Sequence, residues 1–142
     1  MLTVGLIGAG RIGRIHANTI VQYDGSQLVA VADSVYENAK NLAKTYGVNP
    51  TSVDEIFKDN SIESILIASS TDTHSDFIEK ASKAGKAILC EKPVDLSLAR
   101  AKRCLENTKS NEHSIMMGFN RRFDPNFVAL KNALDGGEIG TA

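Results

Sequence analysis

Short apolar runs alternate along this chain with longer segments whose apolar residues recur at helical spacing. The runs cover residues 2–7, 28–33, 64–69, 87–91 and 114–119. Their apolar residues are mostly consecutive rather than alternating, which is typical of strands buried on both faces. The pattern therefore predicts an α/β fold in which a parallel sheet is covered by helices.

The segments between the runs carry residues that start and stop helices. Helix N-termini are predicted at the capping-box pairs Ser34–Glu37 and Ser52–Glu55, at Asp72 or Thr73, at Ser97 before a helix over 97–110, and at Asp124 before Pro125. Gly47 and Gly85 stand where two helices should end. The chain is thus expected to alternate strands with helices, without an internal repeat or a flexible linker.

The first apolar run ends in three glycines spaced Gly8-x-Gly10-x-x-Gly13. At such a turn Gly8 allows the tight bend out of the strand, Gly10 lets the backbone approach a pyrophosphate, and Gly13 lets the helix pack close to the strand. Backbone amides at the start of the helix would face the phosphates. The order of strand, turn and helix predicts a dinucleotide-binding βαβ unit in a doubly wound sheet of the Rossmann type.

Asp33 ends the second apolar run, twenty residues after Gly13. Its carboxylate can accept hydrogen bonds from the adenosine ribose, and its charge would repel the extra 2′-phosphate of NADP. NAD is therefore the predicted cofactor, although Ser34 leaves some use of NADP open. We expect the cofactor to contact the turn and its surroundings at Gly8, Ala9, Gly10, Arg11, Ile12, Gly13, Asp33 and Ser34.

The overall composition argues against several other classes of protein. The 142 residues suit one domain, and their formal net charge of −1 leaves no basic stripe of the kind that binds nucleic acid. No apolar run reaches the roughly 20 residues of a membrane span, and residues 1–10 lack the organisation of a signal peptide. We therefore expect a cytoplasmic protein with no membrane or nucleic-acid partner. Its cysteines, Cys90 and Cys104, have no metal-ligand spacing and are expected to be reduced and packed.

Residues that follow each strand are the candidates for chemistry, because nucleotides bind at the carboxyl ends of such strands. At the end of the third run, Ser69, Ser70 and Thr71 carry small hydroxyl groups that can approach the nicotinamide ribose. His74 follows, either as an ordinary residue at a helix start or as a neighbour of the cofactor.

Two charged segments follow the last two runs. Glu91-Lys92-Pro93 places a lysine where it could orient a substrate hydroxyl and help its proton leave. Asn120-Arg121-Arg122 places two guanidinium groups where they could hold substrate hydroxyls or cofactor phosphate, or form a salt bridge between domains. The residues alone leave open which arginine has which role.

The end of the chain predicts a helix, DPNFVALKNAL, that runs to Gly136-Gly137. We expect a nucleotide-binding domain over 1–122 and, over 123–142, a linking helix with the start of a substrate domain that is cut short. A helix that leaves a completed sheet in this way normally leads into a second domain.

The combination of GLIGAGRIG, Asp33, TDTHSDF, CEKPVDLSLA and GFNRRFDPNF resembles the Gfo/Idh/MocA oxidoreductases, and most closely their inositol 2-dehydrogenases. The resemblance covers essentially all 142 residues, and GFNRRFD is the segment that favours inositol. It implies an NAD-dependent dehydrogenase that transfers hydride from a cyclic polyol, myo-inositol or a close relative, to NAD and so gives a ketone and NADH.

The resemblance also implies roles for individual residues. Cofactor contacts are expected at Gly8, Gly10, Gly13, Asp33, Ser70, Thr71, His74, Glu91 and Asn120, with Lys92 assisting catalysis and Arg121 near the substrate. Members of this family continue into a second α/β domain that forms a homo-oligomer, a dimer or a tetramer, and supplies an aspartate and a histidine to the substrate. The proton-accepting histidine is therefore not expected among His16, His74 and His113, and the 142 residues alone are expected to be inactive.

Two other functions stay open at this point. Relatives that act on another cyclic polyol, an aldose or a sugar acid share the glycine turn and Glu-Lys-Pro. A non-catalytic NAD-binding module, such as a redox sensor, also fits a chain of 142 residues. A pure sensor, however, has no evident need for Lys92 at a strand end.

Overall fold

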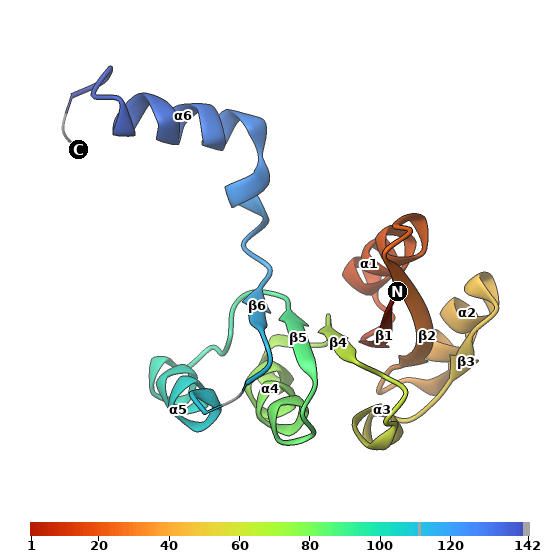
Figure 1. Cartoon of the computed structure of the whole chain (residues 1–142). Coiled ribbons are helices and arrows are strands. Elements are labelled where there is room, and N and C mark those ends of the chain that lie inside the picture. The colour runs from red at the N-terminus through yellow and green to blue at the C-terminus, as the bar shows by residue number, and fades with distance from the viewer. Residues whose placement is uncertain (111, 141–142) are drawn as a thin grey trace.

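The computed structural model describes residues 1–110 and 112–140, and within them six strands form one sheet. The strands are β1 (Leu2–Ile7), β2 (Ser26–Ala32), β3 (Asn49–Pro50), β4 (Ser64–Ile67), β5 (Ala87–Cys90) and β6 (Ile115–Met117). They lie in the order β3-β2-β1-β4-β5-β6, and every neighbouring pair is parallel (Figure 1). This is the strand order of a doubly wound dinucleotide-binding sheet, so the predicted fold class is confirmed.

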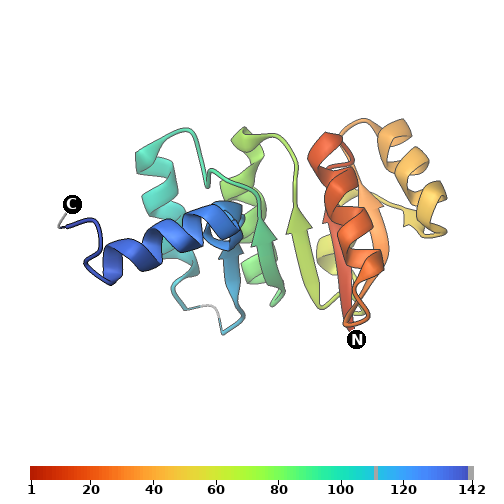
Figure 2. The ribbon, with the colours of Figure 1, turned by 90° about the horizontal axis from the view of Figure 1, so that it is seen from above.

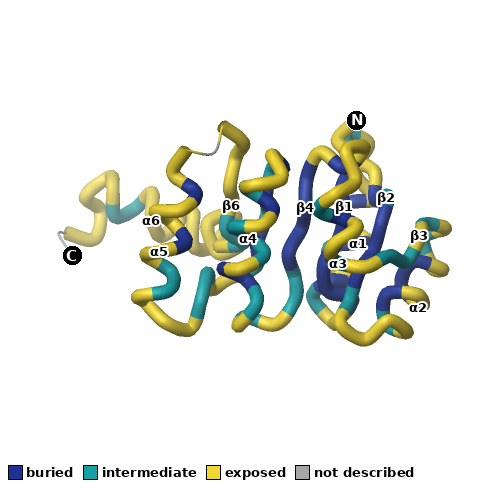
Figure 3. The backbone as a smooth tube through the Cα atoms, turned by 90° about the horizontal axis from the view of Figure 1, so that it is seen from below, coloured by how far each residue is buried: buried dark blue, intermediate teal, exposed yellow. Residues whose placement is uncertain are grey.

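Helices connect the strands and cover both faces of the sheet. They are α1 (Arg11–Gln22), α2 (Tyr36–Tyr46), α3 (Val53–Lys58), α4 (His74–Lys83), α5 (Leu98–Thr108) and α6 (Pro125–Asp135), with short 3-10 turns η1 (Thr71–Thr73) and η2 (Asn120–Phe123). Figure 1 shows α1 and α2 on one side of the sheet and α3, α4 and α5 on the other. Figures 2 and 3 view the molecule from these two sides in turn.

Two apolar clusters, one on each side of the sheet, form the core. Leu6 of β1 packs with Ala17 of α1 and Leu42 of α2, whereas its neighbour Ile7 packs in the cluster of α3, α4 and α5. Successive residues of a strand point to opposite faces, so both faces of β1 are buried. The dark blue strands at the centre of Figure 3 show this burial. It explains why the sequence shows continuous apolar runs rather than alternation.

The structure confirms most of the predicted helix ends. The side chains of Ser52, Ser97 and Asp124 cap α3, α5 and α6, while Gly47 and Gly85 adopt left-handed φ angles of 67° and 69° where α2 and α4 end. At α3 the reciprocal bonds of a capping box are both present. Hydrogen bonds from the hydroxyl of Thr51 and from the amide and hydroxyl of Ser52 lower the pKa of Glu55 to about 2.

Two predicted caps are wrong, and one strand was not predicted. α2 begins after Val35 rather than with a capping box at Ser34, because the carboxylate of Asp33 accepts the Val35 amide and organises this turn instead. Thr73 precedes α4, but its hydroxyl points back and donates to the carbonyl of Ser70, so neither it nor Asp72 caps the helix. β3 has two residues, one of them proline, which is too short for an apolar run.

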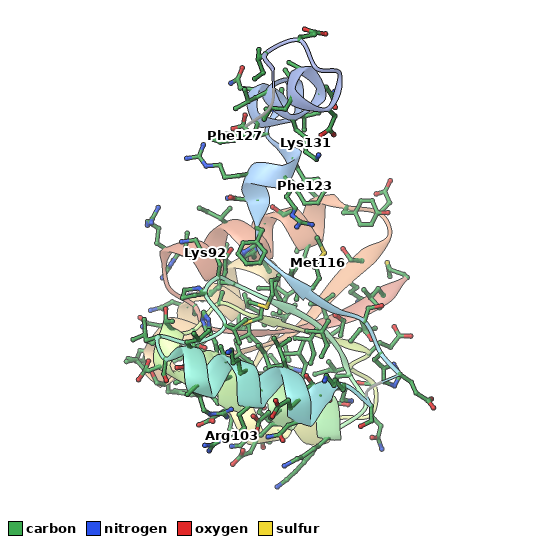
Figure 4. All side chains as sticks on the ribbon, turned by 90° about the vertical axis from the view of Figure 1, so that its left-hand side faces the viewer. Lys92, Arg103, Met116, Phe123, Phe127 and Lys131 are labelled. Carbon is green, nitrogen blue, oxygen red and sulfur yellow. The ribbon has the colours of Figure 1, made fainter. Side chains whose placement is uncertain are left out.

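The last helix stands apart from the rest of the molecule. α6 has no buried residue and extends away from the sheet (Figures 1 and 4). Its start at Pro125 lies close to the predicted boundary at residue 122, which stays a prediction. Across residues 1–110 and 112–140, no helix combines the length and the apolar character that crossing a membrane requires.

Candidate cofactor and substrate site

Two of the three turn glycines are required by the packing of the protein itself. Gly8 has a left-handed φ of 103°, and a Cβ placed there would lie 2.4 Å from the carbonyl oxygen of Ala68. A Cβ at Gly13 would lie 1.8 Å from the carbonyl oxygen of Gly8. Both distances are far inside van der Waals contact, so these positions accept only glycine.

The third glycine faces open space. A Cβ at Gly10 would meet nothing within 4 Å, although Gly10 is the residue that caps α1. No side chain of the described protein caps this helix, and the backbone bond from Arg14 to Gly10 leaves the amides of residues 11–13 ahead of the helical ladder. Bare amides beside an open position fit the diphosphate of a dinucleotide.

A cleft of about 430 Å³ opens in front of this turn. It lies at the ends of β1 and β4, the neighbouring strands at which the strand order of the sheet reverses. Doubly wound sheets bind nucleotides at this position. Its lining contains many of the predicted cofactor residues: Gly8, Gly10, Arg11, Ile12, Asp33, Ser34, Ser69 and Ser70. Ala9 and Gly13 are buried and are not among its lining residues, so their contacts with the cofactor stay predictions.

The cleft also contains residues that the sequence analysis missed. Val35, Val53 and Phe77 give it an apolar side, and Asn38 and Thr73 add polar atoms. An apolar wall suits the flat face of a nucleotide base. Only Val35 had a visible signal, as an apolar residue placed just after Asp33 in a loop. Val53 and Phe77 come from α3 and α4, and only the folded chain brings them to the same place.

Asp33 is held in place before any ligand binds. Its Oδ2 accepts the amide of Ala9, inside the glycine turn, at 2.7 Å, and its Oδ1 accepts the amide of Val35 at 2.8 Å. The carboxylate therefore ties the turn after β1 to the turn after β2. Oδ1 also lies 3.5 Å from the side-chain nitrogen of Asn38. A carboxylate has about four acceptor positions, so Oδ2 can still accept a ribose hydroxyl.

The residues after β4 divide into exposed and enclosed groups. Ser69 and Ser70 line the cleft, and the hydroxyl of Ser69 lies 2.7 Å from that of Thr73. His74 is only 1% exposed, and its ring nitrogens lie 2.8 Å from the carbonyl oxygen of Pro93 and 3.0 Å from that of Ser69. The ring thus supports the loop after β5, and its contact with the cofactor stays a prediction, as does that of Thr71.

Lys92 lies at the edge of a second cavity, of about 570 Å³, together with Asn120, Arg121, Phe123 and Asp124. The fold thus brings the predicted catalytic lysine, in the loop after β5, together with the predicted cofactor residue Asn120 and the predicted substrate residue Arg121 of η2. The guanidinium of Arg121 lies 3.7 Å from a carboxylate oxygen of Asp124 and 5.1 Å from the ring centre of Phe127. Lys92 and Phe123 lie on the side of the sheet from which α6 projects (Figure 4).

The two arginines of η2 face different surroundings. Arg122 lies with Arg121 in a separate hollow against α6, but Arg121 alone of the two also lines the cavity that holds Lys92. Arg121 is therefore the arginine that lies with Lys92, and its contact with the substrate stays a prediction.

The cysteines take no part in this site. Both are buried and free, as predicted, and burial raises the pKa of Cys90 to about 12, so its thiol stays protonated at neutral pH. Among the residues that the structure describes, no cluster of His, Cys, Asp and Glu side chains could hold a metal ion.

Comparisons with known proteins identify a matching family and similar relatives. A family model described as "Oxidoreductase family, NAD-binding Rossmann fold" matches residues 2–119. The inositol 2-dehydrogenase of Rhizobium meliloti is 45% identical over 136 residues, which are 96% of this chain and 41% of the relative. The chain therefore spans about two fifths of the length of such relatives.

Solved structures agree with the sequence matches. The myo-inositol dehydrogenase of Lactobacillus casei, in complex with NAD(H) and myo-inositol, superimposes with a TM-score of 0.91 at 31% identity, over 99% of this chain and 43% of that one. The scyllo-inositol dehydrogenase of the same organism, with bound NAD(H) and scyllo-inositol, gives a TM-score of 0.92 at 28% identity, over 99% and 42%.

The glycines of the turn offer a matched pair of substitutions. Gly13→Ala should lower the free energy of unfolding by about 3 kcal/mol, because its methyl group collides with the Gly8 carbonyl. Gly10→Ala should cost less than about 1 kcal/mol, since its methyl group enters open space, yet weaken NAD binding at least tenfold. Urea denaturation and calorimetric titration measure the two effects. Equal stability losses in the two variants would contradict this division of roles.

Proposed function

Because this chain belongs to the Gfo/Idh/MocA oxidoreductase family, whose NAD-binding Rossmann domain it supplies over residues 2–119, we propose that it is the nucleotide-binding part of a polyol dehydrogenase. The complete protein oxidises one CH–OH group of a cyclic polyol, myo-inositol or a close relative, to a ketone. The observation that supports this proposal is the cavity that Lys92 shares with Asn120 and Arg121. This cavity lies at the carboxyl ends of the strands, the same edge of the sheet as the NAD cleft.

The proposed binding mode follows from the geometry of the turn. The amides of residues 11–13 hold the diphosphate, and Asp33 accepts the ribose hydroxyls next to adenine. Ser69, Ser70 and Thr71 border the other ribose, with Glu91 and Asn120 beyond them. NAD, when bound, supplies the acceptor for the hydride that leaves the substrate.

The proposed chemistry of the chain's own residues centres on one cation. The Lys92 ammonium donates a hydrogen bond to the oxygen of the reacting hydroxyl and stabilises the negative charge that develops there as the proton leaves. Arg121 holds a further hydroxyl of the polyol through its forked donors. The group that removes the proton comes from the part of the protein beyond this chain. The 142 residues alone therefore bind NAD without oxidising a polyol.

A second candidate keeps the reaction and changes the substrate. Relatives named for myo-inositol and for scyllo-inositol both superimpose on this chain with nearly equal TM-scores. Initial rates of NADH formation with the complete protein, measured on both inositols, an aldose and a sugar acid, decide between them. The complete protein is further proposed to be a cytoplasmic homo-oligomer, a dimer or a tetramer.

Substitution of Asp33 tests the assignment of the cofactor. Asp33→Ser removes a charged acceptor and should weaken NAD binding roughly 10- to 100-fold, the equivalent of 1.5–3 kcal/mol. Binding of NADP relative to NAD should rise, because the repulsion of the 2′-phosphate is gone. Calorimetric titration of the 142-residue chain with each nucleotide gives both numbers. Unchanged affinity for both would remove Asp33 from the site.

Substitution of Lys92 separates catalysis from binding. Lys92→Ala in the complete protein should lower kcat at least 100-fold and change the Kd for NAD less than threefold, because the lysine acts on the reacting oxygen. Lys102→Ala, an exposed lysine of α5, serves as the control and should leave both values unchanged. Equal losses in turnover and in NAD affinity would assign Lys92 to cofactor binding instead.

A further inference from the structure

We propose that His16 and Glu91 form a positioning pair that fixes the loop carrying Lys92 against α1 and so sets where the lysine meets the substrate. The inference rests on the proposed function and extends it to residues for which the sequence suggested no such role. The sequence analysis does not expect His16 to be the proton acceptor and predicts Glu91 as a cofactor contact.

The pair itself is a short, partly buried contact between distant parts of the chain. Nε2 of His16, on α1, lies 2.8 Å from Oε1 of Glu91, at the end of β5, and the side chains are 24% and 22% exposed. An ionised carboxylate only accepts hydrogen bonds, so Nε2 carries the donated proton. Such a charge-assisted bond is stronger than one between neutral groups, and partial burial reduces its screening by solvent.

Glu91 transmits this contact directly to Lys92. Its backbone amide donates to the carbonyl of Ile67 at 2.9 Å, which fixes its Cα on the sheet. Its second carboxylate oxygen lies 3.3 Å from the amide nitrogen of Lys92. Gly118 leaves room for this side chain, because a Cβ there would lie 3.3 Å from the carboxyl carbon of Glu91. The carboxylate thus bridges α1, the loop after β5 and the strand end of β6.

The rest of the loop is anchored in the same manner, one residue at a time. The carbonyl of Pro93 meets the ring of His74, and a carboxylate oxygen of Asp95 accepts the hydroxyl of Ser75 at 2.6 Å. The hydrogen bond from Ser75 and, to a smaller extent, the hydrogen bond from the amide of Ser97 lower the pKa of Asp95. Alternate residues of the loop are therefore tied to the protein, while Lys92 between them is exposed. The contact of Glu91 with His16 is the anchor on the α1 side.

The position of His16 on α1 connects the pair to the cofactor cleft. His16 lies one helical turn after Ile12, which lines the NAD cleft, so both belong to the helix whose amides face the diphosphate. The pair therefore sets the position of the lysine relative to the bound cofactor. Errors of about 1 Å in such a position lower turnover about 100-fold.

Hydrogen exchange of the chain without nucleotide tests the pair of His16 and Glu91 independently of NAD binding. His16→Ala should raise the exchange rates of the amides of Glu91, Lys92 and Val94 at least tenfold, whereas His16→Gln, whose amide can still donate to Glu91, should restore most of the protection. Asn18→Ala, an exposed position of the same helix, is the control and should leave this segment unchanged. Identical exchange in His16→Ala and the unaltered chain would overturn the proposal.

Kinetics of the complete protein test the consequence for catalysis. His16→Ala should lower kcat about tenfold with less than a twofold change in KM for NAD, and His16→Gln should recover most of kcat. A loss confined to KM, or no recovery by glutamine, would refute a positioning role. Failure of the unaltered chain to bind NAD would contradict the proposed function. The exchange experiment would still decide whether His16 and Glu91 fix the loop that carries Lys92.

Discussion

The hydrogen bonds that Asp33 accepts are the constraint from which the geometry of the site follows. One carboxylate oxygen holds the amide of Ala9 in the glycine turn, and the other holds the amide of Val35 at the start of the next connection. Two loops that are 24 residues apart in sequence are thereby fixed against each other. The turn is held in its shape before a nucleotide arrives, so little ordering is left for binding to achieve.

The glycines and Asp33 divide the work at this point. Gly8 and Gly13 permit a close contact between strand and helix that no side chain would allow, while Gly10 keeps the approach to the helix amides open. Two positions therefore serve the fold and one serves the ligand, although all three belong to a single motif. The cavity with Lys92 lies beyond this region, where the ends of β5 and β6 bring separate segments together.

Local signals made most of the fold predictable from the sequence. Continuous apolar runs correctly predicted strands buried on both faces. The helix starts were predicted from Ser52, Ser97 and Asp124, because a capping side chain bonds to an amide within three residues. The cap at Ser34 was wrong because the carboxylate of Asp33 accepts the Val35 amide and organises the turn before α2 instead. β3 was not predicted because its two residues, one of them proline, are too short to form an apolar run. The cleft was predicted as far as its motif extends, whereas Val53, Phe77 and the contact of His16 with Glu91 depend on tertiary packing that no local pattern records.

A crystal structure of the 142-residue chain with NAD tests the central claim most directly. We expect the diphosphate at the amides of residues 11–13 and the adenosine ribose hydroxyls within hydrogen-bond distance of Asp33, with the bond from Ala9 to Asp33 retained. An empty cleft at saturating NAD, or a nucleotide bound elsewhere with Asp33 contacting only protein, would contradict the account.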